Sequence, residues 1–342
     1  MILSPVALTM GEPAGIGGEI TIKAWLRRHD DELPAFFAID DPARLAHLAK
    51  VMDWPVPITE IAAPEDTLAV FGEALPVLAR PLPGRTLPGD PDPANALAVQ
   101  SSIEEAVGFA TTGRAAAVVT NPIHKSVLYD AGFKHAGHTE YLAELAGGVD
   151  RPVMMLCCDE LRVVPVTGHL SLREAVEKLH ADDIEATARI VWRALEFDFG
   201  IEQPHIAVAA LNPHAGEQGA MGREEIEIIG PAVELLKKEG LSISGPVPAD
   251  TLFHERARKS YDAAICMYHD QALIPLKTID FSSGVNITLG LPFVRTSPDH
   301  GTAFEIAGTG VADETSLVAA LKMATSIAAR RQTIEVRGAS AV

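Results

Sequence analysis

The chain has 342 residues, a length that predicts about two domains. Its 46 acidic residues outnumber its 28 basic residues, and the formal net charge of −18 excludes a broad basic surface for nucleic acid or for an anionic membrane. Hydrophobic residues make up 47% of the chain, which is enough for a large core and excludes disorder as the main state. The three cysteines form no C-x-x-C pair, the N-terminus lacks a signal-peptide pattern and no apolar stretch reaches the roughly 18 residues of a membrane span, so we expect a cytoplasmic protein.

Short apolar runs alternate with amphipathic segments along the chain. The runs are rich in Val and Ile and are bounded by Gly, Pro, Asn, Asp or Ser, a pattern that predicts buried strands. In chain order the predicted strands are Pro5–Met10, Ala35–Ile39, Ala115–Thr120, Val153–Cys158, Leu161–Val166, Ile206–Leu211, Ala263–Met267 and Val285–Leu289. The predicted helices are Glu19–Arg28, Pro42–Met52, Asn95–Thr112, His138–Ala146, Ser171–Phe197, Arg223–Glu239 and Glu314–Arg330.

This alternation of strands and helices predicts an α/β fold with mostly parallel sheets. Ser171 and Glu174 form a capping-box pattern, which predicts the start of the longest helix at that point. The segment Pro55–Pro93 is rich in proline and has little periodicity, so we expect loops and short strands there.

Three histidines follow predicted strands, at the end of the strand where α/β sheets bind their ligands. They are His169, His214 and His269. Imidazole is a good ligand for Zn, Co, Ni or Mn, and three protein ligands leave positions open for a substrate. A single histidine of this kind is more often a hydrogen-bonded loop or core residue. Three in equivalent positions favour a metal site.

A glycine-rich loop follows the first predicted strand and opens a helix. Its glycines fall at Gly11, Gly15, Gly17 and Gly18, so the G-x-G-x-x-G dinucleotide pattern is missing. Backbone N–H groups at such a helix start can still bind a phosphate or a nicotinamide amide. A tight turn between strand and helix is an equally good interpretation of the loop by itself.

Several polar residues predict a small anion site in this acidic protein. Lys277, Asn286 and Arg295 lie near the ends of predicted strands and can hold a phosphate or carboxylate. His138 and Thr139, after Gly at the start of a predicted helix, can add contacts through their side chains and the helix N–H groups. The alternatives are surface charges for the cations, a loop cap for the Asn and a plain helix N-cap for the Thr.

Asp250 and Asp270 are candidates for proton transfer or for orienting a histidine ligand. A lone loop Asp is more often a cap or turn residue. Cys266 lies on a predicted strand, where a buried core residue is a better interpretation than a nucleophile. No G-x-S-x-G elbow is present, so acyl hydrolysis by an activated serine has no support.

The order of these motifs resembles that of the 4-hydroxythreonine-4-phosphate dehydrogenase family of vitamin B6 biosynthesis, from the first strand to about residue 313. The motifs that carry the resemblance are Gly11-Glu-Pro-Ala-Gly-Ile-Gly17, Gly137-His-Thr-Glu140, Asn212-Pro-His-Ala-Gly-Glu217, Pro248-Ala-Asp-Thr251, Tyr268-His-Asp-Gln271, Gly284-Val-Asn-Ile-Thr-Leu-Gly-Leu-Pro292 and Arg295-Thr-Ser-Pro-Asp-His-Gly-Thr302. One departure is Gly18, where the family usually has Pro, and it loosens the turn slightly.

The resemblance implies a fold like that of isocitrate and isopropylmalate dehydrogenases, with two α/β/α domains and the active site in the cleft between them. The first domain would comprise residues 1–128 and 290–342 with the NAD-binding loops. The second would comprise residues 129–289 with the metal site and the dimer interface. The enzymes of this family are homodimers with an active site shared between subunits, and their metal ligands come from both.

The resemblance also implies a role for each candidate residue. One divalent metal per subunit (Zn, Mg, Co or Mn) would bind His169, His214 and His269. The substrate would contact His138, Thr139, Lys277, Asn286 and Arg295. The NAD(P) site would include Gly11, Gly15, Gly17, Asp299, His300 and Gly301, and the catalytic residues would be Asp250, Asp270 and Lys277.

The implied reaction is the NAD(P)-dependent oxidation of 4-phosphooxy-L-threonine to 2-amino-3-oxo-4-phosphooxybutanoate, which loses CO₂ to give 3-amino-2-oxopropyl phosphate. The group that takes the hydroxyl proton stays open among Asp250, Asp270 and water on the metal. The nearest alternative is a dehydrogenase of 4-phospho-D-threonate or 4-phospho-D-erythronate in sugar-acid catabolism. A phosphate acyltransferase, which needs no three-histidine metal, and a non-catalytic binding protein of the same fold are further alternatives.

Overall fold

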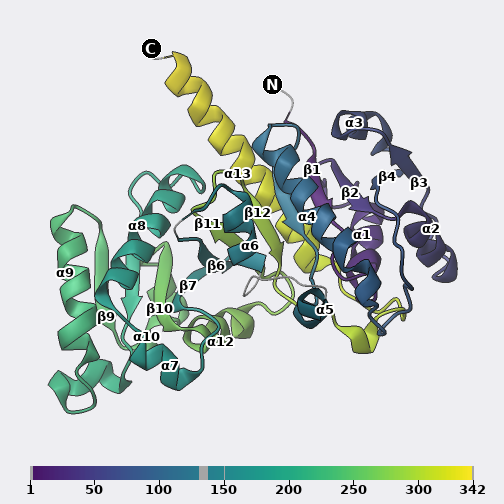
Figure 1. Cartoon of the computed structure of the whole chain (residues 1–342). Coiled ribbons are helices and arrows are strands. Elements are labelled where there is room, and N and C mark those ends of the chain that lie inside the picture. Colours follow the sequence, from purple (N-terminus) through teal and green to yellow (C-terminus); the bar gives the residue numbers. More distant parts are fainter. Residues whose placement is uncertain (1–2, 131–137, 150, 341–342) are drawn as a thin grey trace. The chain divides into compact units, whose positions relative to one another are not determined.

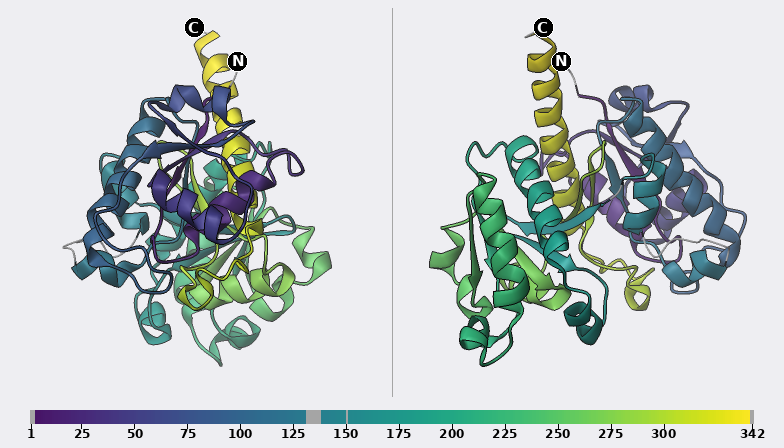
Figure 2. Two further views of the ribbon diagram at one scale, coloured as in Figure 1. Left: turned by 90° about the vertical axis from the view of Figure 1, so that its right-hand side faces the viewer. Right: turned by 60° about the vertical axis from the view of Figure 1, so that its left-hand side comes forward.

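The computed structural model describes residues 3–130, 138–149 and 151–340 of the chain. The chain divides into two compact units (Figures 1 and 2). Unit 1 comprises Met1–Pro152 and Leu291–Ala329, and unit 2 comprises Val153–Gly290 and Arg330–Val342. The domain boundaries expected from the sequence, at 128/129 and 289/290, stay predictions. The chain passes from one compact unit to the other at 152/153 and at 290/291.

The described residues of unit 1 form six strands, each parallel to its neighbours, in the order β3-β4-β2-β1-β5-β12. The strands are β1 (Val6–Thr9), β2 (Phe36–Asp40), β3 (Ile58–Ile61), β4 (Leu75–Ala79), β5 (Val118–Thr120) and β12 (Arg295–Pro298). The helices are α1 (Gly17–Leu26), α2 (Pro42–Val51), α3 (Thr67–Val70), α4 (Ala96–Thr111), α5 (Lys125–Asp130) and α6 (His138–Leu145), with 3₁₀ turns η1 (Pro64–Asp66), η2 (Pro93–Asn95) and η5 (Phe304–Ile306). Helix α13 (Thr315–Ser340) begins in unit 1, and its residues from Arg330 on belong to unit 2.

The core of unit 1 forms where apolar strand residues meet the helices. Ala7, Phe37 and Ile39 from the strands belong to one buried cluster with Val99 and Ile103 of α4. Each of these five side chains is at most 2% exposed, so the cluster contributes the burial of large apolar surface that holds the layers together.

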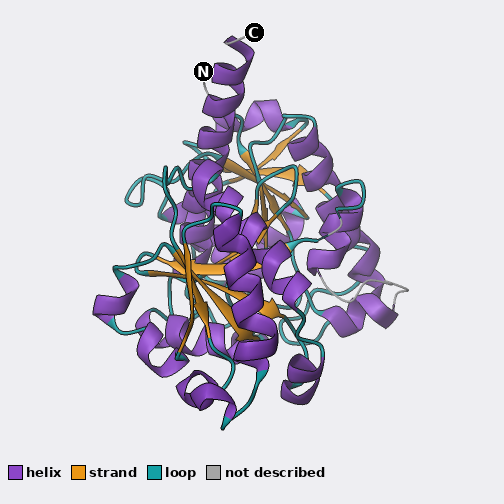
Figure 3. Cartoon of the chain, turned by 90° about the vertical axis from the view of Figure 1, so that its left-hand side faces the viewer, coloured by secondary structure: helices purple, strands orange, loops and turns teal. Residues whose placement is uncertain are grey.

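Unit 2 contains six strands in the order β11-β6-β7-β10-β8-β9. The strands β7, β10, β8 and β9 are parallel, whereas β6 runs antiparallel to both β7 and β11. Figure 3 shows the strands in orange with helices packed around them. The strands are β6 (Val153–Cys158), β7 (Leu161–Thr167), β8 (Ile206–Ala209), β9 (Ile243–Val247), β10 (Ala263–Tyr268) and β11 (Val285–Leu289). The helices are α7 (Leu172–Glu177), α8 (Ala181–Phe197), α9 (Gly230–Lys238), α10 (Ala249–Leu252), α11 (Glu255–Arg258) and α12 (His269–Ile279), with the 3₁₀ segment η3 (Pro213–Gly219) and the π-helical turn η4 (Glu225–Ile229).

All eight predicted strands are present, as β1, β2, β5, β6, β7, β8, β10 and β11. The α/β class with largely parallel sheets is therefore confirmed. The proline-rich segment contains the two short strands β3 and β4. Two strands outside it were not predicted. The segment of β9 contains Gly245 and Pro246, which interrupt an apolar run and are tolerated because β9 lies at the sheet edge. The segment of β12 is Arg-Thr-Ser-Pro, which is polar and nevertheless buried throughout.

The predicted single helix over Ser171–Phe197 is wrong, because the chain forms two helices there. Ser171 and Glu174 do make the predicted capping box, but it opens the six-residue α7. Lys178 ends α7, and His180 adopts an extended conformation as the N-cap of α8. Leu179 between them is 2% exposed, so burial of this side chain accompanies the break.

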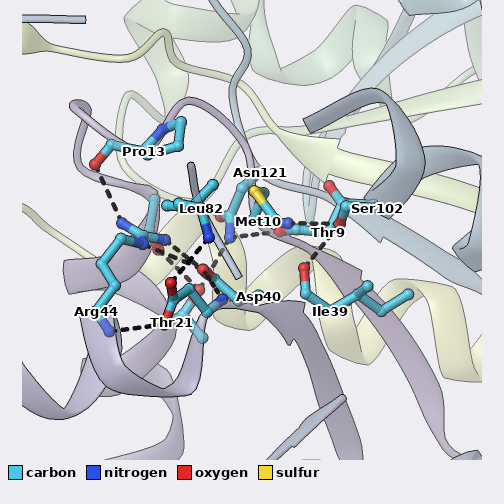
Figure 4. Close-up of polar contacts among 12 residues, drawn as sticks. Thr9, Met10, Pro13, Thr21, Ile39, Asp40, Arg44, Leu82, Ser102 and Asn121 are labelled. Carbon is cyan, nitrogen blue, oxygen red and sulfur yellow. Dashed lines mark hydrogen bonds and ion pairs between the residues drawn. The ribbon is translucent and has the colours of Figure 1, made fainter. Parts of the chain in front are cut away.

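Polar side chains tie together the carboxyl ends of the strands in unit 1 (Figure 4). The Ser102 hydroxyl accepts a hydrogen bond from the Met10 N–H (3.1 Å) and donates one to the Ile39 carbonyl (2.8 Å). The Asn121 side-chain amide donates to the Thr9 carbonyl at 3.0 Å. These buried bonds link β1, β2 and β5 at the edge from which the glycine-rich loop departs.

A buried ion pair lies at the same edge (Figure 4). Arg44 of α2 donates to both carboxylate oxygens of Asp40, with Nε–Oδ1 at 3.1 Å and Nη2–Oδ2 at 2.5 Å, and to the Pro13 carbonyl at 3.1 Å. The side chains are 7% and 1% exposed. The pair therefore connects the end of β2 to the glycine-rich loop without contact with bulk water.

Among the described residues, no helix is long and apolar enough to cross a membrane.

Breaking this pair should destabilise the protein strongly. Arg44→Met leaves the Asp40 carboxylate buried without its charged partner, which typically costs about 3–5 kcal/mol. We expect a clear fall in the urea midpoint measured by circular dichroism. The matched control is Lys259→Met, which removes the exposed (i, i+4) partner of Glu255 and should move the midpoint little. Equal midpoints for the two variants would contradict the importance of the buried pair.

Candidate functional site

The three predicted metal ligands lie beyond the carboxyl ends of adjacent parallel strands in unit 2. His169 follows β7 after one intervening residue, and His269 is the first residue of α12, directly after β10. His214 lies in η3, which follows β8. The strand order β7-β10-β8 places the ends of these strands side by side. The fold thus brings all three segments to one edge of the sheet.

Two of the three histidine rings are direct neighbours. The ring centroids of His169 and His269 are 5.3 Å apart, with an interplanar angle of 42°. Two imidazole nitrogens that share a tetrahedral metal, each at about 2.0–2.1 Å, place their ring centroids about 5 Å apart. The spacing of this pair therefore fits a shared metal ion.

Asp270 is placed to orient the second ring of the pair. Its Oδ1 lies 2.8 Å from Nδ1 of His269. A carboxylate accepts hydrogen bonds, so Nδ1 donates and Nε2 keeps the lone pair that a metal requires. The Asp270 side chain is 71% exposed, while that of His269 is 31% exposed. This contact favours the orienting interpretation of Asp270 over proton transfer.

His214 is exposed and lies on an unusual turn. Its φ and ψ are 53° and 28°, in the left-handed region, and the four residues after it also have positive φ. Within the part of the chain that the structure describes, no three His, Cys, Asp or Glu side chains come together to hold a metal. The described residues thus bring the rings of His169 and His269 together, without a third ligand beside them.

The predicted phosphate residues of unit 2 lie away from the histidines. Lys277 follows His269 by eight residues on α12, about 12 Å along the helix axis, and its Nζ is 5.3 Å from the ring centroid of Phe281. Asn286 on β11 is in register with Leu156 of β6, which pairs with Val163 of β7. The latter residue lies four positions before the end of β7, or about 13 Å along the strand.

Asn286 also has an unused acceptor. Its Oδ1 is buried and finds no hydrogen-bond partner among the described residues.

Asp250 is exposed in the four-residue helix α10. Burial raises the pKa of the Cys266 thiol, and this cysteine is fully buried, which confirms that it is a core residue.

In unit 1, close packing requires glycine at the predicted cofactor-binding positions, whose cofactor role stays a prediction. Gly11 has φ +67°, and a Cβ there would lie 2.7 Å from the Pro122 carbonyl oxygen. At Gly15 a Cβ would lie 2.8 Å from the Thr302 carbonyl oxygen, and at Gly17 it would lie 3.0 Å from a backbone oxygen. The glycine-rich loop therefore packs directly on two other segments that follow strand ends, and side chains would separate them.

The segment that contains Asp299, His300 and Gly301 follows β12. Directly after it, the Thr302 carbonyl accepts a hydrogen bond from the Ile16 N–H (3.0 Å) at the start of α1, and the chain is held there again a few residues later. Glu19, which is 1% exposed, accepts hydrogen bonds from the N–H groups of Gly308 (2.5 Å) and Gly310 (2.8 Å). No sequence pattern indicates this role, because Glu19 resembles any acidic residue in the first turn of a helix.

Arg295 lies at the start of β12 and is 4% exposed. Its Nη2 donates to the Thr120 hydroxyl at 2.7 Å, at the end of β5. Burial lowers the pKa of Arg295 to about 10, so the guanidinium is still a cation at neutral pH. His138 and Thr139 begin α6, but their side chains lie outside the described residues.

The packing around the glycine-rich loop can be tested by adding one methyl group. Gly11→Ala requires a left-handed alanine and brings Cβ against a backbone oxygen, so we expect a loss of at least about 1–2 kcal/mol in the free energy of unfolding. Urea denaturation measures this change. Gly108→Ala is the matched control, since Gly108 lies within α4 with no atom within 4 Å of the added Cβ. That variant should be as stable as the parent or more so. A stable Gly11→Ala protein would contradict the close packing.

Comparisons with known proteins agree along almost the whole chain. Residues 32–324 match the family described as "Pyridoxal phosphate biosynthetic protein PdxA". The 4-hydroxythreonine-4-phosphate dehydrogenase of Bradyrhizobium diazoefficiens is 55% identical over 338 residues, covering 96% of this chain and 98% of that protein.

Solved structures give the same result for the fold. The crystal structure of 4-hydroxythreonine-4-phosphate dehydrogenase from Klebsiella pneumoniae has a TM-score of 0.85 and 37% identity, with 96% of this chain and 98% of that chain covered. A β-decarboxylating dehydrogenase from Thermococcus kodakarensis has a TM-score of 0.50 and 14% identity, covering 97% of this chain and 88% of that chain. At this identity the likeness concerns the fold alone. It confirms the expected relation to the isocitrate and isopropylmalate dehydrogenase fold.

Proposed function

Because the chain belongs to the PdxA family of pyridoxal phosphate biosynthetic proteins, we propose that it oxidises 4-phosphooxy-L-threonine (4-hydroxythreonine 4-phosphate) with NAD(P)⁺. The observation that carries this proposal is the 55% identity to a dehydrogenase of that name over 96% of the chain. The C3 carbon loses a hydride to the nicotinamide, and the hydroxyl group on it loses a proton to a base. The product is a β-keto acid, 2-amino-3-oxo-4-phosphooxybutanoate, which loses CO₂ to give 3-amino-2-oxopropyl phosphate.

The proposed metal ligands are His169, His214 and His269. A divalent metal (Zn, Mg, Co or Mn) at this edge would supply a Lewis acid for the substrate hydroxyl. The 5.3 Å spacing of the first and third rings supports the assignment. Asp270 supports it as well, because its carboxylate keeps the proton on Nδ1 of His269 and leaves Nε2 for the metal.

The proposed phosphate ligands are Lys277 and Arg295, with Asn286, His138 and Thr139 as further substrate contacts. Arg295 carries a positive charge in a buried position, where its interaction with a dianionic phosphate is weakly screened. The free acceptor of Asn286 suits the substrate ammonium or a hydroxyl group. We place NAD(P) near Gly11, Gly15 and Gly17 and the Asp299–Gly301 segment, and the hydrogen bond from the Ile16 N–H to the Thr302 carbonyl directly after that segment supports a fixed loop there.

We further propose that the enzyme is a homodimer with shared active sites and that it works in the cytoplasm. In the substrate, the reacting hydroxyl and the phosphate are on neighbouring carbons. Within one subunit, however, Lys277 lies about 12 Å along α12 from His269. A site that combines residues of both subunits, metal ligands among them, would resolve this separation.

The first experiment measures NAD(P)H formation by the purified protein with Mg²⁺, Co²⁺, Mn²⁺ or Zn²⁺. We expect turnover of 4-phosphooxy-L-threonine in preference to 4-phospho-D-threonate and 4-phospho-D-erythronate, and loss of turnover on chelation. Parallel assays with NAD⁺ and NADP⁺ identify the preferred cofactor. Preference for the acid-sugar phosphates would contradict the proposed substrate but keep the metal and the chemistry.

The shared site predicts complementation between two inactive variants. His214→Ala and Lys277→Ala should each lose turnover, the first through metal binding and the second through phosphate binding. When the variants are unfolded, mixed in equal amounts and refolded, about half of the dimers are mixed by random pairing. Each mixed dimer has one intact site if the two residues of a site come from different subunits. We then expect about a quarter of the parent activity.

Two controls accompany this mixture. Each variant refolded alone should stay inactive, and parent protein refolded in the same way sets the full activity. An inactive mixture, with dimers of the two variants demonstrated by differential tagging, would contradict the shared arrangement.

A further inference from the structure

The turn that carries His214 is conformationally unfavourable for most of its residues. Five consecutive residues, His214, Ala215, Gly216, Glu217 and Gln218, have φ values of 53°, 52°, 78°, 44° and 56°. Only one of them is glycine, and residues with a side chain disfavour the left-handed region. Such a backbone needs strong local ties to persist.

The hydrogen bonds that hold the start of this turn go to one buried carboxylate, that of Glu225 in the π-helical turn η4. Glu225 is 5% exposed. Its Oε1 accepts hydrogen bonds from the N–H groups of Leu211 (2.9 Å) and Asn212 (2.7 Å), and its Oε2 accepts one from the Asn212 side-chain amide at 3.0 Å. Three donors thus converge on one carboxylate immediately before Pro213 and His214.

The same carboxylate is wedged against the turn itself. A Cβ at Gly216 would lie 2.6 Å from Oε2 of Glu225. The neighbouring Glu224 accepts a second hydrogen bond from the Asn212 amide, at 2.6 Å. Glu225 therefore lies against the chain both before and after His214, and the backbone of His214 lies between these two points.

We propose that Glu225 is a positioning residue that sets the location of the His214 imidazole and thereby controls the affinity of the site for its divalent metal. This inference rests on the proposed function, in which His214 is a metal ligand. Outer groups that orient a ligand typically contribute about 10–100-fold to metal affinity. Glu225 acts at the backbone of the ligand's own turn, whereas Asp270 acts on the ring of His269.

The test is Glu225→Gln, which keeps the shape of the side chain but removes one acceptor. The amide has a single oxygen, so it can serve the backbone N–H pair or the Asn212 amide, and its NH₂ group faces another donor. The control is Glu227→Gln on the same turn, because Glu227 is 56% exposed and pairs with Arg223 at the surface. The full-length chain is titrated with Co²⁺ and Zn²⁺ by calorimetry, and the visible spectrum of Co²⁺ reports on its ligands.

We expect Glu225→Gln to weaken Co²⁺ and Zn²⁺ binding by about tenfold or more, with the parent circular dichroism spectrum, while Glu227→Gln binds like the parent. The double variant of Glu225→Gln with His214→Ala should bind no more weakly than His214→Ala alone, because the first residue acts through the second. A general structural role would not produce this lack of additivity.

Distinct outcomes separate the positioning role of Glu225 from the assignment of His214 as a metal ligand. Parent-like affinity of Glu225→Gln, or an undiminished effect of that substitution in the His214→Ala background, would overturn the positioning role alone. Parent-like affinity of His214→Ala would overturn both the metal assignment and the positioning role. If Glu225→Gln does not fold, Asn212→Ala decides the question, since it removes the side-chain hydrogen bonds to Glu225 and Glu224 and keeps the backbone N–H groups. Parent-like metal affinity of a folded Asn212→Ala protein would then overturn the proposal.

Discussion

The parallel pairing of β7, β10 and β8 is the constraint on which the candidate metal site depends. Parallel strands end at one edge of a sheet, so the segments that follow them must meet there even though they are far apart in sequence. His169, His214 and His269 are separated by 45 and 55 residues, and only this pairing brings their segments together. The position of each ring within its segment then depends on local hydrogen bonds, which differ among the three.

Two sets of predicted residues lie at different positions along the strand direction in unit 2. The histidines lie at the carboxyl ends of the strands, whereas Asn286 is level with Val163 in the first half of β7. Helix α12 runs between the two levels, with His269 at its first residue and Lys277 near its last turn. One helix therefore carries a proposed metal ligand and a proposed phosphate ligand at separate heights. This separation is the observation behind the proposal that one substrate meets residues of different subunits.

Much of the fold could be predicted from the sequence because buried parallel strands are apolar throughout. All eight apolar runs are strands, and the motifs in their loops indicated the family. The exceptions have physical causes. The strand β12 is polar because Arg295 and Thr296 make buried hydrogen bonds with neighbouring elements, so hydropathy carries no signal there. The break after α7 depends on the burial of Leu179, which lies within an otherwise continuous helical pattern. Glycines 11, 15 and 17 suggested a cofactor, but their spacing does not distinguish a ligand from a carbonyl oxygen of the chain.

The residues that sequence reasoning missed are buried carboxylates that hold loops. Asp40, Glu19 and Glu225 are 1%, 1% and 5% exposed among 46 acidic residues, most of which are surface charges by composition alone. Removing a carboxylate from water is costly, and each of these three offsets that cost with two or more N–H donors from another segment. The donors are backbone groups in two of the cases, so no side-chain pattern reveals the partner. Loop anchoring by acidic residues is therefore invisible in the sequence, yet it fixes the segments from which the proposed site is built.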